Sequence, residues 1–159
     1  MIEHKPLYQA MIQAVSQTLE NMAFMEVLEH PDKAFEIPAA ELTWASLLIH
    51  DPVQGELRLA MPQPLLRTLT GNIFGMDEEE VTPEQQNDIL NELLNTIAGL
   101  FMTNLLATDQ KYQLGLPERG EDGLPEPDAD TVVWKLMTSD EEPLQLFAVG
   151  ASLVALKND

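Results

Sequence analysis

The alternation of apolar and polar positions predicts a long amphipathic helix over residues 83–106. At ~100° per residue, one broad face of this helix is apolar and a narrow stripe on the opposite side is polar. The apolar positions are Ile89, Leu90, Leu93, Leu94, Ile97, Leu100, Phe101 and Leu105. The stripe consists of Asp88, Glu92, Asn95 and Gly99. We therefore expect the apolar face to join the core and the stripe to face outward.

The ends of this helix also carry recognisable signals. Thr82 is suited to cap its N-terminus, with Pro83 at the first helical position and Glu84 in the first turn. Asn104 falls among the apolar positions, so we expect it to find a hydrogen-bond partner there.

Four further elements are predicted before the long helix. Residues 6–28 repeat apolar side chains along one helical face, which indicates an amphipathic helix. Residues 41–50 and 55–61 are typical of two strands joined in a hairpin. Residues 63–74 predict a short helix, which Gly75 ends.

After the long helix, the pattern favours strands. We expect a strand at residues 112–116, a loop rich in proline, glycine and acidic residues at 117–130, and two strands at 131–138 and 143–156. The order of elements predicts one α+β domain over residues 1–159, a two-layer fold in which long helices pack on one face of an antiparallel sheet.

The polar stripe of the long helix has two unusual members. Such a stripe is usually just solvated surface. However, a glycine inside a helix costs ~1 kcal/mol relative to alanine, and asparagine is a mediocre helix former. Gly99 would let another backbone approach closely, and Asn95, one turn earlier, offers both a donor and an acceptor at that point. These residues favour a contact site over plain surface.

The stripe resembles the motif of the CheC/CheX/FliY family of chemotaxis phosphatases. That motif has Asp or Ser, then Glu four residues on, then Asn three residues further. Here Asp88, Glu92 and Asn95 keep this spacing, and Gly99 follows, as is common in the CheX-like branch. Leu116 and Pro117 lie near the family's downstream proline, and the resemblance extends to residues 21–27, 74–80 and 112–117.

The resemblance implies a single CheX-like domain that hydrolyses the phospho-aspartate of a CheY-like response regulator. Asn95 would orient the attacking water, Glu92 would dock the regulator's lysine and Gly99 would be a binding residue. Asp88 is either a further binding residue at the rim or a solvated acid that the helix dipole favours. Any Mg2+ would belong to the regulator, so no cofactor of the chain's own is expected. The resemblance also implies a homodimer formed through the sheets.

A degenerate copy of the motif occurs in the first predicted helix. Ser16 and Glu20 keep the spacing, but Ala23 stands where a second carboxamide would be. This copy is either the relic of a second site or a chance match in a Glu-rich sequence.

Charge and composition limit the partners. With 27 Asp and Glu against 8 Lys and Arg, the formal net charge is −19, which repels nucleic acids and anionic membranes. Response regulators are commonly acidic around their phosphorylation pocket, so long-range attraction would not favour binding to one. Complementary contacts at short range would have to provide the affinity. The chain has no cysteine, no long apolar run and no signal-peptide pattern at its start, so we expect a soluble cytoplasmic protein without membrane insertion.

Other chemistries find little support in the sequence. His4, His30 and His50 lie apart and lack the spacing of metal ligands. Two alternatives to a phosphatase are a non-catalytic module of the same fold that binds a regulator or scaffold, and a purely structural oligomerisation domain. A non-catalytic module would not need a carboxamide at Asn95. A structural oligomerisation domain would not explain a glycine at position 99 on the exposed face of the helix.

Overall fold

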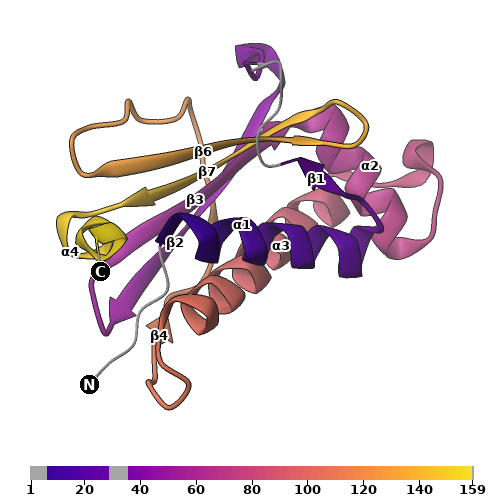
Figure 1. The fold of residues 1–159 in the computed structure, drawn as a ribbon. Coiled ribbons are helices and arrows are strands. Elements are labelled where there is room, and N and C mark those ends of the chain that lie inside the picture. Colours follow the sequence, from indigo (N-terminus) through magenta and orange to yellow (C-terminus); the bar gives the residue numbers. More distant parts are fainter. Residues whose placement is uncertain (1–6, 29–35, 159) are drawn as a thin grey trace.

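A computed structural model describes residues 7–28 and 36–158 of the chain (Figure 1). Seven antiparallel strands form one sheet in the order β1-β6-β7-β3-β2-β4, and β5 also pairs with β2. The strands are β1 (Val27–Leu28), β2 (Leu42–Asp51), β3 (Gly55–Pro62), β4 (Gln113–Leu114), β5 (Glu118–Arg119), β6 (Thr131–Thr138) and β7 (Pro143–Val149). The α-helices are α1 (Leu7–Ala23), α2 (Gln63–Phe74), α3 (Pro83–Leu105) and α4 (Ala151–Val154). Three short 3-10 helices are η1 (Ala39–Glu41), η2 (Glu78–Glu80) and η3 (Ala155–Asn158).

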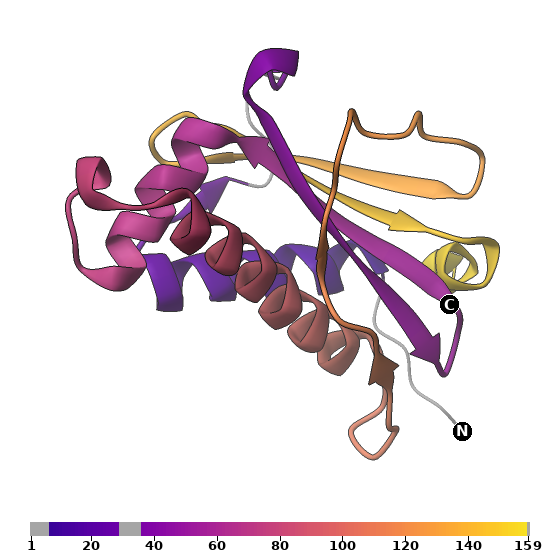
Figure 2. The ribbon, with the colours of Figure 1, turned by 180° about the vertical axis from the view of Figure 1, so that it is seen from behind.

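The helices α1 and α3 lie side by side across one face of the sheet (Figures 1 and 2). Along β2, Ala45, Leu47 and Ile49 are buried beneath these helices, while the residues between them are more exposed. This alternation is that of a strand with one face in the core. The predicted α+β fold is therefore confirmed. No helix in the described ranges is long and apolar enough to cross a membrane.

The long helix α3 begins as predicted. The Thr82 hydroxyl accepts a hydrogen bond from the Gln85 backbone N–H, and the Gln85 side chain accepts one from the Thr82 N–H, which together form a capping box. At the other end, the Asn104 amide donates to the Ala10 carbonyl at 3.3 Å, so the outlier of the apolar face has the partner it required. This bond also ties α3 to α1.

The first helix is shorter than predicted. α1 ends at Ala23, because Phe24 adopts a left-handed conformation (φ 57°) and the Met25 N–H donates back to the Leu19 carbonyl. The chain then forms β1, which pairs with β6 at the edge of the sheet.

The predicted final strand over residues 143–156 is wrong in its second half. β7 ends at Val149, Gly150 has a positive φ of 120°, and α4 follows. Leu153 of α4 packs against Gly55, where an added Cβ would lie 2.8 Å from the Leu153 Cβ. An apolar run cannot by itself distinguish a buried strand from a buried helix, so the sequence pattern missed this turn.

Much of the predicted loop at 117–130 is attached to the sheet. We call residues 115–127 the strap: it runs alongside β2 and close to α3 in Figure 2. The Gly115 and Gly120 N–H groups donate to the carbonyls of Leu48 and Trp44, each at 2.7 Å. The Trp44 indole N–H donates to the Asp122 carbonyl at 2.9 Å. The strap therefore covers the free edge of β2.

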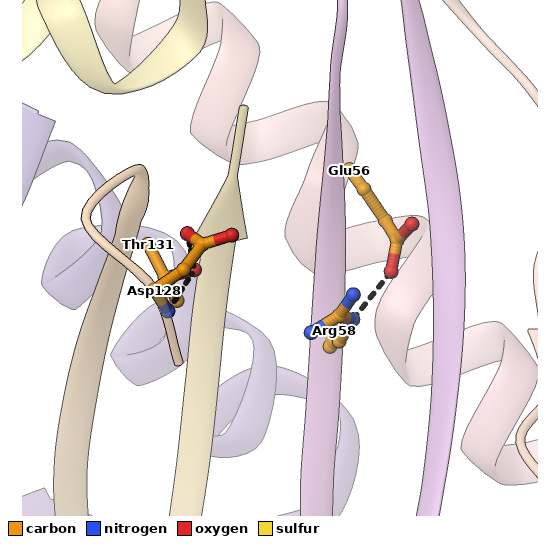
Figure 3. A network of polar contacts seen from close by, with 4 residues as sticks. All are labelled: Glu56, Arg58, Asp128 and Thr131. Atoms are coloured by element: carbon orange, nitrogen blue, oxygen red, sulfur yellow. Dashed lines mark hydrogen bonds and ion pairs between the residues drawn. The ribbon is translucent and has the colours of Figure 1, made fainter. Parts of the chain in front are cut away.

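The outer face of the sheet, away from the helices, carries polar pairs (Figure 3). Arg58 and Glu56 form an ion pair on β3. Asp128, just before β6, accepts a hydrogen bond from the Thr131 hydroxyl at 2.9 Å. This bond, the Asp130 N–H and the more distant charge of Arg58 lower the pKa of Asp128.

Candidate functional site

The helix α3 presents its polar stripe to solvent. Asp88, Glu92 and Asn95 are exposed and Gly99 is half-buried, whereas Leu90, Leu93, Leu94 and Ile97 on the opposite face are completely buried. Burial of the apolar face against α1 and the sheet fixes the rotation of the helix. The four residues singled out in the sequence therefore lie on one surface line along α3.

A shallow hollow of about 390 Å³ lies between this line and the strap. It is lined by Asp88, Asn91, Glu92, Asn95, Leu116 and Pro117. The structure thus brings Asp88, Glu92 and Asn95 together, while Gly99 lies one turn beyond the hollow. The hollow joins residues that are more than 20 positions apart in the sequence.

The polar groups of the hollow have few partners within the protein. Glu92 accepts one long hydrogen bond from the Thr96 hydroxyl, at 3.4 Å. Among the described residues, Glu92 forms no ion pair and the Asn95 carboxamide makes no hydrogen bond. The two side chains lie one helical turn apart, ~5–6 Å between Cβ atoms. A carboxylate and a carboxamide so placed can engage a cation and a water molecule on one partner at the same time.

Gly99 keeps open space above the helix. A Cβ added there would meet only the Tyr112 hydroxyl, at 3.8 Å. The Gly99 carbonyl accepts hydrogen bonds from Thr103 Oγ1 at 2.9 Å and from Tyr112 OH at 3.3 Å. Nothing in the described chain uses the close approach that a glycine permits, so that space is available to another molecule.

Three residues around the hollow were not predicted from the sequence. Asn91 lines it beside Glu92, and its Oδ1 is buried without a hydrogen-bond partner among the described residues. Tyr112 and Arg119 brace the strap: the Arg119 guanidinium donates to Asn87 Oδ1 at 3.3 Å and to Thr43 Oγ1 at 3.1 Å. Asn91 could have been noticed in the sequence, because it is a second mediocre helix former, four residues before Asn95. The contacts of Tyr112 and Arg119 had no such feature in the sequence.

The degenerate copy of the motif in α1 differs from the stripe on α3 in its exposure. Glu20 is exposed and Ser16 is half-buried, but Ala23 is completely buried. The Ala23 carbonyl accepts a hydrogen bond from the Asn72 amide at 3.0 Å. A carboxamide at this position would therefore point into packed protein rather than into solvent.

Of the three histidines, only His50 lies in the described part of the chain, exposed near the end of β2. No group of three His, Cys, Asp or Glu side chains is placed to hold a metal ion within residues 7–28 and 36–158. His4 and His30 lie outside those residues.

The chain is similar to known proteins in both sequence and fold. The family model described as "Chemotaxis phosphatase CheX" matches residues 45–123, about half of the chain, from β2 through α3 to the strap. No curated protein matches the sequence.

Solved structures share the whole fold. Chemotaxis protein CheX from Vibrio vulnificus superposes with a TM-score of 0.69 at 12% identity, covering 91% of this chain and 96% of that one. CheX in a CheX–CheY–BeF3–Mg2+ complex from Borrelia burgdorferi gives 0.68 at 16% identity, covering 89% and 95%. FliY from Thermotoga maritima gives 0.62 at 13% identity, covering 94% and 88%.

At these identities the superpositions show a shared fold and do not by themselves show a shared activity. The family model adds a match in sequence over residues 45–123, the segment in which the hollow lies. The fold, the family model and the spacing of the stripe on α3 together show that the chain belongs to the CheC/CheX/FliY family.

Proposed function

We propose that the chain hydrolyses the phospho-aspartate of a CheY-like response regulator at the hollow beside α3. The observation that carries the proposal is the pairing of Glu92 and Asn95, exposed one turn apart and without an ion pair in the described chain. The family resemblance and the CheX–CheY complex from Borrelia burgdorferi support the choice of partner.

In the proposed reaction, a water oxygen bonds to phosphorus in line with the aspartate oxygen. The phosphorus–aspartate oxygen bond breaks and the carboxylate leaves with the electron pair. The oxygen of the water and its two protons leave with the inorganic phosphate. Asn95 orients the water, because its C=O accepts from the water while its NH2 donates to a nearby oxygen. Positioning of this sort is worth roughly 10²–10⁴-fold in rate.

Glu92 docks the regulator through its lysine. An exposed carboxylate at this point of α3 can pair with an ammonium group and so place the phosphoryl group over Asn95. We assign Glu92 this docking role only and no proton transfer. Mg2+ on the regulator supplies the charge neutralisation that phosphoryl transfer needs.

The experiment that tests this proposal follows the decay of a phosphorylated CheY-like regulator from the same cell. Four additions are compared: the wild-type protein, Glu92→Ala, Asn95→Ala and none. We expect the wild type to accelerate decay and Asn95→Ala to lose roughly 10²-fold or more of that acceleration while it still binds the regulator with beryllium fluoride in place of the phosphoryl group. Glu92→Ala should also weaken binding.

Glu84→Ala is the matched control, since Glu84 is an exposed glutamate in the first turn of the same helix. It should leave both decay and binding unchanged. If the wild type binds the regulator without accelerating decay, the protein is a docking module and the phosphatase proposal is wrong.

A further inference from the structure

Leu116 is the most exposed large apolar side chain in the described part of the chain, with 86% of its surface accessible. A single exposed leucine is ordinary in itself. This one, however, lies on the strap at the rim of the hollow that contains Glu92 and Asn95. It is therefore placed to touch whatever binds the two polar residues.

The backbone that carries Leu116 is held on both sides. Next to it, the Gly115 N–H donates to the Leu48 carbonyl of β2, and further along the Gly120 N–H donates to Trp44. Before it, Tyr112 donates to the Gly99 carbonyl on α3. Because this backbone is already fixed, it loses little conformational entropy on binding, which suits Leu116 to act as an anchor.

Asn91 lies on the opposite wall of the same hollow. Its Oδ1 is buried and has no donor within the described chain. A buried acceptor without a donor costs ~1–3 kcal/mol. Because this oxygen is closed to solvent, a partner N–H can reach it only if the Asn91 carboxamide turns into the hollow, and a hydrogen bond made there would remove the cost. The hollow thus combines an exposed apolar group with an unsatisfied acceptor beside Glu92 and Asn95.

The charge of the chain shows why such contacts matter. At a formal net charge of −19, long-range attraction does not favour an acidic regulator, and the hollow itself carries Asp88 and Glu92. Affinity must then come from short-range contacts. An apolar anchor and a hydrogen bond are contacts of this kind, and neither depends on the sign of the partner's charge.

We propose that Leu116 and Asn91 form the docking contact of this site and select its regulator, an inference that rests on the proposed function. Leu116 inserts into an apolar depression beside the regulator's phosphorylation pocket. The Asn91 carboxamide turns into the hollow on binding, and its Oδ1 then accepts a hydrogen bond from a regulator N–H. Neither residue takes part in the hydrolysis, which Glu92 and Asn95 carry.

The test measures initial rates of dephosphorylation against regulator concentration for the wild type, Leu116→Ser and Asn91→Ala. Anchor residues of interfaces typically change affinity tenfold or more, so we expect Leu116→Ser to raise KM about tenfold and leave kcat unchanged. Asn91→Ala should raise KM in the same direction. Leu116→Met, which keeps an apolar group, should stay close to the wild type.

Phe74→Ser is the matched control, because Phe74 is half-exposed at the end of α2 and does not line the hollow. It should leave KM unchanged. A Leu116→Ser protein with the KM of this control would overturn the inference while the proposed function stands. A fall in kcat at constant KM would overturn it as well, since the residue would then act in the chemical step.

Titration of the beryllium fluoride-treated regulator separates the two proposals. If the wild type binds it without accelerating decay, and Leu116→Ser weakens that binding, the docking contact stands and the phosphatase proposal fails. If the wild type does not bind it at all, both are wrong.

Discussion

At the scale of single residues, Gly99 lowers the stability of α3 but keeps the outward face of the helix accessible to a partner. A glycine inside a helix is less favourable than alanine by roughly 0.5–1 kcal/mol. The structure leaves room for a methyl group there, since an added Cβ meets only the Tyr112 hydroxyl at 3.8 Å. Packing within the chain therefore does not require the glycine, whereas close approach of a partner would.

We accordingly predict opposite effects of Gly99→Ala on stability and on binding. The free energy of unfolding, measured by urea denaturation, should rise by roughly 0.5–1 kcal/mol. The affinity for the beryllium fluoride-treated regulator should fall. A variant that is more stable and binds as well as the wild type would show that no partner backbone approaches this position.

At the scale of elements, the site depends on two pieces that are held in different ways. α3 carries its own capping box and buries a continuous apolar face. The strap has two residues in β5 and otherwise depends on contacts with β2 and α3. Gly120 leaves no room for a side chain beside the Trp44 indole, because a Cβ on Gly120 would lie 2.1 Å from Trp44 Cε2.

Gly120→Ala should therefore detach the strap from β2. We expect a loss of stability of about 1–3 kcal/mol, as for overpacked sites, and a red shift of Trp44 fluorescence as its indole becomes more exposed. Trp134 is completely buried in the core and should not respond. KM for the regulator should rise, since the strap positions Leu116.

Gly123→Ala is the control for this experiment, because an added Cβ at Gly123 meets nothing within 4 Å. It should match the wild type in stability, fluorescence and KM. If Gly120→Ala changes the fluorescence but not KM, the strap does not contribute to docking.

At the scale of the whole molecule, charge governs the encounter with any partner. The formal net charge is −19, and only two ion pairs, Arg58–Glu56 and Lys135–Glu36, occur among the described residues. Most of the negative charge thus faces solvent without compensation at close range. The homodimer implied by the family resemblance stays a prediction, and it would bring two such charges together.

We predict that salt accelerates binding of an acidic regulator. Raising the ionic strength from about 0.01 M to about 0.15 M shortens the Debye length from ~30 Å to ~8 Å and screens like-charge repulsion. The association rate, measured by stopped-flow fluorescence with the beryllium fluoride-treated regulator, should therefore increase while the dissociation rate changes little. An association rate that falls with salt would indicate a basic docking surface on the regulator.

The sequence by itself determined the long helix and the residues on its outward face. Spacings of three or four residues, which are local and periodic, predict its cap and its apolar face. The same spacings place Asp88, Glu92, Asn95 and Gly99 on one line. The hairpin of β2 and β3 and the α+β class were predictable for the same reason.

Only the tertiary structure decided where the local pattern ends and what surrounds the stripe. Gly150 turns the final apolar run into α4, whose Leu153 packs against Gly55 of β3. α1 ends before Phe24, where the Ala23 carbonyl accepts a hydrogen bond from Asn72 of α2. The burial of Asn91 Oδ1 and the position of Leu116 depend on a strap that joins β2 some 70 residues earlier in the chain. Contacts over such separations leave no period in the sequence, so they could be seen only once the chain was folded.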